Sequence, residues 1–368
     1  MTSDALVRLG RTALPIVAIL SLLLGVGLTL AAAGDTLGFD FLAYHQAAAR
    51  LLAGQALYDM SYTETGGFGL FYYPPTFAPL VLAFGALGPA TATWAWIALS
   101  LVAFLIGVVV LPVARDVRWW IVLLAGWSFP FVYALKLGQV GPILFATFAI
   151  GWRWLDRPVV LGLSGALGAA IKIQPGLVLF WALLTRRWVA VVVGGAALVV
   201  LAALSVALAG FGAWTDFLSL LRTVSDPITT EHNLTPGAVA YRLGAPTGAA
   251  AGLQLAAIVA AVGVLFAAVR WCTAEASYLA AVIVSQLISP ILWDHYAMLL
   301  LLPVAYLLQH RQWWAIAIPL LTAWPLVEVT PSELYPALFA VTLVAVLWVG
   351  RRSEAATPEL HPAPTPAT

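Results

Sequence analysis

A few polar side chains in this otherwise apolar sequence have the properties needed for acid–base and anion chemistry. The segment "GFDFLAYHQ" contains Asp40, Tyr44 and His45. The two lysines of the chain, Lys136 and Lys172, stand in "KLGQVGP" and "IKIQPG". A carboxylate on a short helix suits a general base. Lysine and histidine cations suit a bound anion, most naturally a phosphate.

Further candidates of the same kind lie elsewhere in the chain. They are found in "FYYPP", "KLGQVGP", "IKIQPG", "HNLTPG" and "SPILWDHY", and comprise Tyr73, Gln139, Gln174, Asn233, Asp294 and His295. Aromatic faces are apolar and suit the C–H faces of sugar rings, whereas amides and carboxylates bond to hydroxyl groups. No spacing among the acidic and histidine residues requires a metal site, and we expect neither a metal nor a cofactor.

Simpler interpretations exist for each of these residues. Asp40 could be the N-cap of a helix that begins at Phe41, and Asp294 with His295 could start another helix. The lysines could lie at helix ends and extend their ammonium groups toward water. Asn233 also lies in an N-x-T pattern typical of glycosylation acceptors, which is a weak motif. These interpretations do not explain why all the groups fall on one side of the membrane in the topology that follows.

Composition indicates an integral membrane protein. The chain has 368 residues, of which 62% are hydrophobic and 9% charged, and its formal net charge is +1. Its mean hydropathy is +0.98. Soluble proteins carry about 25% charged residues. Nothing in the charge suggests a nucleic-acid partner. Cys272 is the single cysteine, which excludes an intrachain disulfide.

Apolar runs predict an all-α polytopic protein of about twelve transmembrane helices in a single domain, residues 1–350. The tail, 351–368, has a composition typical of disorder. The outer loops are 34–89 and 211–250, and the apolar segment 76–88 is short enough to predict an interfacial or re-entrant helix. The predicted spans are 14–33, 90–113, 119–135, 139–155, 158–171, 173–185, 188–210, 251–271, 276–292, 295–309, 312–328 and 334–350.

The arginines indicate the orientation. If twelve spans begin from a cytoplasmic N-terminus, both termini are cytoplasmic and only Arg50, Arg222 and Arg242 of the arginines fall outside. The length of the run 14–33 favours an uncleaved span over a signal peptide. The short spans 158–171 and 173–185 meet at a polar break, which is tolerated where helices line a cavity.

This topology brings the polar candidates to the outer membrane face. Charges near the membrane core are costly and usually mark function. A lipid-linked sugar phosphate would use a base, cations and aromatic faces together. A transporter or flippase of a lipid-linked saccharide is the alternative; it would need polar groups on both faces and usually has internal repeats.

The successive motifs resemble those of glycosyltransferase family 87. These motifs are "DFLAYHQAAARLLAGQALYD", "YYPPTFAPL", "KLGQVGPILF", "GALGAAIKIQPGLVLFWALLTRRW" and "SPILWDHYAMLLLLP", and they extend from about residue 38 to 305. The resemblance implies a GT-C-type bundle with juxtamembrane helices in the first outer loop. It implies an inverting, metal-independent enzyme of the bacterial inner membrane. Such an enzyme moves a sugar, with mannose favoured, from a polyprenyl monophosphate to an extracytoplasmic lipid or glycan hydroxyl.

The resemblance also implies roles for individual residues. Asp40 matches the loop-one aspartate and would be the general base. Lys172, in the K-x-x-P motif, and His295 would bind the donor phosphate. Lys136 is added as a third cation, and the expected substrate-binding residues are Tyr44, His45, Tyr73, Gln139, Gln174, Asn233 and Asp294. The expected partners are the donor, the acceptor and membrane lipids.

Overall fold

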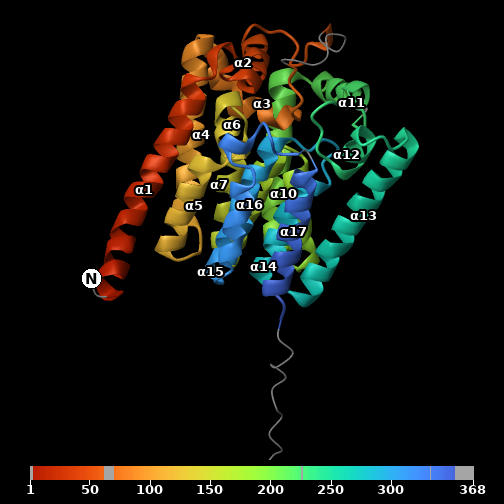
Figure 1. Ribbon diagram of the computed structural model, residues 1–368. Helices are drawn as coiled ribbons and strands as arrows, with labels where there is room; N and C mark the ends of the chain where they lie inside the picture. The colour runs from red at the N-terminus through yellow and green to blue at the C-terminus, as the bar shows by residue number, and fades with distance from the viewer. Residues whose placement is uncertain (1–2, 62–69, 225–226, 332, 353–368) are drawn as a thin grey trace, which may run out of the picture.

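The computed structural model describes residues 3–61, 70–224, 227–331 and 333–352, and these residues form a helical bundle. No β-strand occurs among them; there are two isolated bridges, Ser128–Ala323 and Cys272–Arg351. Figure 1 shows the longer helices side by side, with the N-terminus at the lower end. The short helices α2 (Phe39–Leu52), α11 (Gly212–Val224) and α12 (Pro236–Arg242) gather toward the upper end.

Within the described part of the chain, four helices are long and apolar enough to cross a membrane: α1 (Ser3–Ala31), α4 (Pro89–Val110), α10 (Trp188–Ala209) and α13 (Thr247–Trp271). Their mean hydropathy lies between 2.3 and 2.7. Many of their apolar side chains face outward; Val192 is 69% exposed and Leu255 64%. Apolar surface on this scale fits hydrocarbon and not water, so the chain is a multi-pass membrane protein.

The remaining helices are shorter than a bilayer crossing. A fifth span is obtained if the pair α6 (Phe129–Leu137) and α7 (Gly141–Arg153), bent by 118°, is taken as one. The other predicted spans remain predictions, because about 20 residues are needed to cross. They correspond to the shorter helices α8 (Pro158–Ile171), α9 (Leu177–Leu184), α14 (Ala274–Leu287), α15 (Leu301–Gln309) and α17 (Leu334–Val349).

Among the predicted spans, 119–135, 295–309 and 312–328 are not single helices. The span 119–135 is divided at Ser128 into α5 (Arg115–Trp127) and α6. The span 295–309 begins as a 3-10 helix, η6 (Asp294–Leu300), before α15. The span 312–328 consists of η7 (Trp313–Ile316), α16 (Ala317–Leu320) and η8 (Trp324–Leu326). Proline at an early helical position contributes to two of these breaks, because its ring fixes φ and it donates no hydrogen bond.

The segment 76–88 forms three short pieces, η3 (Pro75–Phe77), α3 (Ala78–Val81) and η4 (Leu82–Ala86). The last of these packs against α2: a Cβ atom added at Gly85 would lie 2.6 Å from the backbone of Ala48. The predicted break between α8 and η5 (Gln174–Gly176) is present, with Lys172 extended between them. The predicted tail lies outside the described residues from position 353 onward.

The start of α2 is fixed to the end of α6 by two left-handed glycines. Gly38 is the N-cap of α2, and its N–H donates to the carbonyl of Lys136 at 2.7 Å. Gly138 ends α6 with φ +68°, and its carbonyl accepts from Trp96 Nε1 at 2.7 Å. Phe41 stacks on Trp96 with ring centroids 5.2 Å apart. The first turn of α2 therefore has a defined position against the turn after α6.

Gly138→Ala is expected to destabilise the protein and displace α2. A left-handed alanine costs about 1–2 kcal/mol. The added Cβ would also lie 2.5 Å from Phe41 Cβ, and overpacking typically costs about 1–3 kcal/mol more. The matched control is Gly54→Ala, since Gly54 has φ +70° but no atom within 4 Å of its Cβ position. Thermal unfolding in detergent compares them; equal losses would contradict the close contact with α2.

Candidate active site

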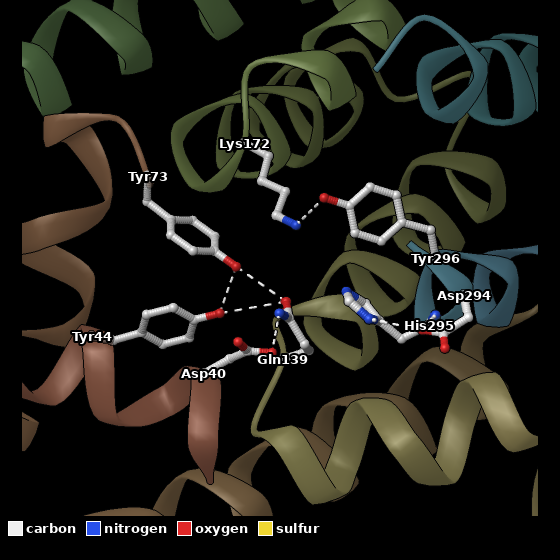
Figure 2. Close-up of polar contacts among 8 residues, drawn as sticks. All are labelled: Asp40, Tyr44, Tyr73, Gln139, Lys172, Asp294, His295 and Tyr296. Carbon is white, nitrogen blue, oxygen red and sulfur yellow. Dashed lines mark hydrogen bonds and ion pairs between the residues drawn. The ribbon is translucent and has the colours of Figure 1, made fainter. Parts of the chain in front are cut away.

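Five parts of the chain bring polar side chains together in the upper part of the bundle. Figure 2 shows them pointing toward one another: Asp40 and Tyr44 from α2, Tyr73 from the loop before η3, Gln139 from the turn after α6, Lys172 from the break after α8, and Asp294, His295 and Tyr296 from η6. Asp40 lies in the first turn of α2, which begins at Phe39, and the N-cap is Gly38 without a side-chain bond. The alternative that Asp40 caps a helix starting at Phe41 is therefore wrong.

Asp40 is held by the amide of Gln139, which is itself held by two phenols. Gln139 Nε2 donates to Asp40 Oδ2 at 2.5 Å. Tyr73 donates to Gln139 Oε1 at 3.1 Å, and the hydroxyls of Tyr44 and Tyr73 lie 2.5 Å apart. Gln139 is 7% exposed and the two tyrosines are buried. The carboxylate therefore has one oxygen bonded to a network of buried side chains.

Lys172 supplies a cation without an acidic partner. Its ammonium donates to Tyr296 Oη at 2.6 Å and lies 4.2 Å from that ring's centroid. The Tyr73 ring is 5.3 Å away. Among the described residues, no carboxylate lies at ion-pair distance from Lys172. Phenols and ring faces stabilise a cation only in part, so an anionic ligand would complete this environment.

His295 offers two ring nitrogens with no hydrogen-bond partner among the described residues. The side chain is buried, and its Nδ1 lies 3.4 Å from Asp294 Oδ1 without forming a hydrogen bond. Trp293, Tyr296 and Tyr133 surround the ring. A buried polar group without a partner is costly, which makes His295 a strong candidate for ligand contact.

Electrostatics modify the proton affinity of Asp40. Burial raises the pKa of its carboxyl above the usual range, and this is the largest effect. His295, the Gln139 hydrogen bond and Lys172 act in the opposite direction, while Asp294 adds to the increase. A carboxylate with a raised pKa is a better proton acceptor than an ordinary aspartate.

Lys136 and His45, two further predicted site residues, lie outside the central group. Lys136 is half-buried, and its ammonium lies 5.5 Å from the centroid of the Tyr133 ring, which itself is 6.5 Å from the ring of His295. His45 Nε2 bonds to the carbonyl of Leu87 at 2.9 Å, away from the group. Both predicted roles stay predictions.

Gln174 and Asn233 contact other parts of the protein. Gln174 donates to Ser289 Oγ at 3.2 Å. The buried Asn233 amide donates to the carbonyls of Pro227 and Pro290, and its oxygen accepts from two backbone N–H groups, including that of Leu292 at 2.9 Å. These bonds hold residues 227–235 against the segment before His295. Substrate contact by either residue stays a prediction.

Tyr296 belongs to this group but is not among the residues predicted from the sequence. It follows Asp294 and His295 directly in "WDHY", and its position next to two predicted site residues could have indicated a role in the site. Its contact with Lys172 joins positions 124 residues apart, and no local pattern indicates that pairing.

The arrangement suits proton transfer next to a bound anion. A carboxylate lies on one side of the group, and an ammonium and an imidazole without acidic hydrogen-bond partners lie on another (Figure 2). In the described part of the chain, no three His, Cys, Asp or Glu side chains are grouped closely enough to hold a metal ion. In a transfer reaction, the carboxylate would accept the proton of an attacking hydroxyl, and the ammonium and imidazole would stabilise a leaving phosphate.

Comparison with known proteins gives one family. The model of glycosyltransferase family 87 matches residues 71–292, which is more than half of the chain. Tyr73, Gln139 and Lys172 lie inside the matched region, whereas Asp40 lies well before its start and His295 shortly after its end. Comparisons with curated proteins and with solved structures gave no match.

Proposed function

Because the chain belongs to glycosyltransferase family 87, we propose that it transfers a sugar from a polyprenyl-monophosphate donor to a hydroxyl of a lipid or glycan acceptor. Mannose is the favoured sugar. The reaction takes place at the extracytoplasmic face of a bacterial inner membrane, with both termini in the cytoplasm. It inverts the anomeric centre and uses no metal or other cofactor.

The observation that supports this proposal is a half-buried carboxylate with two groups beside it, an ammonium without an acidic partner and an imidazole that has only Asp294 as an acidic neighbour. Lys172 lacks an acidic partner, and His295 lacks any hydrogen-bond partner, among the described residues. The phosphate of the donor has two non-bridging oxygens, one for the Lys172 ammonium and one for the His295 ring. The carboxyl of Asp40 points toward this group from α2 (Figure 2). A donor phosphate at the cations would therefore bring the anomeric carbon near the base.

The proposed step is a single displacement. The acceptor hydroxyl oxygen forms a bond to the anomeric carbon while the bond from that carbon to the phosphate oxygen breaks. Asp40 takes the hydroxyl proton, and the electron pair of the broken bond leaves with the polyprenyl phosphate. Lys172 and His295 stabilise the negative charge that develops on the phosphate; such preorganised groups often make the largest contribution to rate.

The function is tested by supplying purified protein in lipid nanodiscs with a panel of polyprenyl-phosphate sugars (mannose, glucose, arabinofuranose) and lipid acceptors. We expect one donor to give an acceptor heavier by one sugar residue, detected by mass spectrometry, together with free polyprenyl phosphate. In proteoliposomes, movement of an intact lipid-linked saccharide across the bilayer with no sugar transfer would instead favour the flippase alternative and contradict this proposal.

A further inference from the structure

We propose that Gln139 is a positioning residue that orients Asp40 by occupying one of its carboxylate oxygens. This inference deepens the proposed function, because it assigns to Gln139 a role in preparing the base instead of contact with substrate. It is based on the hydrogen bonds that join Asp40, Gln139, Tyr44 and Tyr73.

The phenols determine which end of the Gln139 amide faces Asp40. Tyr44 and Tyr73 each have one hydroxyl hydrogen, and both lie within reach of Gln139 Oε1, at 3.5 and 3.1 Å. The two hydrogens cannot both point between the hydroxyls, which are 2.5 Å apart, and neither hydroxyl has another acceptor among the described residues, so at least one hydrogen is donated to Oε1. Burial raises the pKa of Tyr73 to about 12, so this hydroxyl stays protonated at neutral pH.

With Oε1 facing the phenols, the NH₂ group must face Asp40. A flipped amide would bring its carbonyl oxygen to the position 2.5 Å from Asp40 Oδ2, where two acceptors repel. The hydrogen bonds therefore run in one direction, from the phenol hydroxyls through the Gln139 amide to the Asp40 carboxylate. Both amide ends are occupied inside the protein, which leaves little capacity for a substrate hydroxyl.

This contact gives the two carboxylate oxygens different roles. Oδ2 accepts from Gln139, while Oδ1 has no hydrogen-bond partner among the described residues. A carboxylate with one oxygen held and the other free can present a single lone-pair direction to an incoming hydroxyl. Orientation of this kind lowers the entropy lost on reaching the transition state.

The same contact changes the proton affinity of Asp40. Burial raises the pKa of the carboxyl, and the Gln139 bond lowers it. Removal of the Gln139 hydrogen bond should therefore raise the pKa of Asp40 further, so that less of this residue is ionised at a given pH. The other titratable groups that face or influence Asp40 are unchanged by such a variant: Lys172, Asp294, His295, Tyr44, Tyr73 and Tyr133.

Gln139→Leu removes both hydrogen-bonding ends with little change in volume. We expect its kcat to fall at least about tenfold at neutral pH, while the Kd for undecaprenyl monophosphate, measured as a probe of the phosphate site, changes less than about twofold. The acidic limb of the kcat–pH profile should move to higher pH by about one unit, because a hydrogen bond to a charged group is comparable in energy to one pKa unit.

Gln139→Glu should move the acidic limb further, since two buried carboxyls in contact resist ionisation together. Gln46→Glu is its matched control: Gln46 lies on the exposed side of α2, and the added charge there should leave the profile unchanged. Tyr73→Phe should give a smaller shift in the same direction as Gln139→Leu. An unshifted limb in Gln139→Leu would overturn the inference.

A readout without turnover separates this inference from the proposed function. Infrared difference spectra against pH report the protonated carboxyl band of Asp40, assigned by its loss in Asp40→Asn. We expect the band to persist to higher pH in Gln139→Leu than in the unsubstituted protein. If no donor gives transfer, the proposed function fails, yet this titration still decides the inference; an identical titration in both proteins overturns it.

Discussion

Asp40→Asn is expected to reduce sugar transfer by about 10²–10⁴-fold, the usual contribution of a general base. The asparagine amide has nearly the same shape, but its nitrogen cannot accept a proton and its oxygen is a much weaker base. One of its ends would still face Gln139, so the backbone of α2 should remain in place. Transfer is measured by mass spectrometry of the acceptor under single-turnover conditions.

Donor binding should survive this substitution, because the proposed phosphate contacts come from Lys172 and His295. The Kd for undecaprenyl monophosphate should change less than about threefold. Asp35→Asn is the matched control: Asp35 is an exposed carboxylate in the short 3-10 helix that precedes α2, and its loss should leave transfer unchanged. Full activity of Asp40→Asn, or an equal loss in the control, would remove Asp40 as the base.

Lys172→Met is expected to weaken binding of undecaprenyl monophosphate at least about tenfold, because one hydrogen bond between charged groups contributes about 1.5–3 kcal/mol. Methionine keeps the unbranched stem and loses the ammonium. Removal of a half-buried cation without an acidic partner among the described residues should not destabilise the fold. Binding is measured by a titration in nanodiscs, with thermal unfolding recorded alongside.

Two further variants make the result specific. Tyr296→Phe keeps the ring beneath the ammonium but removes the hydroxyl that Lys172 contacts, so binding should weaken by less than in Lys172→Met. Arg270→Met removes an exposed positive charge from the last turn of α13, at the lower end of the bundle, and should leave binding unaltered. Unchanged affinity in Lys172→Met would exclude Lys172 from the phosphate site.

The residue types of the site could be predicted from sequence, but their pairing could not. Asp40, Gln139, Lys172 and His295 were identified because charged and amide groups are rare in a chain this apolar. Their partners lie far away in sequence: Gln139 is 99 positions from Asp40. His45 and His295 illustrate the difference, since each stands near an acid and a tyrosine, yet only His295 lacks hydrogen-bond partners among the described residues.

The number of membrane crossings shows a similar limit. Hydropathy identified the four long helices, because each is a continuous apolar run. It predicted one continuous span for 295–309 and another for 312–328, whereas the structure divides each of them into shorter helices. A hydropathy window averages over the run, and it does not register where the backbone tightens into a 3-10 turn against neighbouring helices.

The sequence by itself determined the class of the protein, its family and most of the residues of the candidate site. These depend on composition and on local motifs, which exist before the chain folds. Tertiary structure alone decided that Gln139 presents its NH₂ group to Asp40, that Tyr296 holds Lys172, and that Asn233 supports a loop. Hydrogen bonds form over about 3 Å and in fixed directions, so they are set only when distant segments of the chain have packed together.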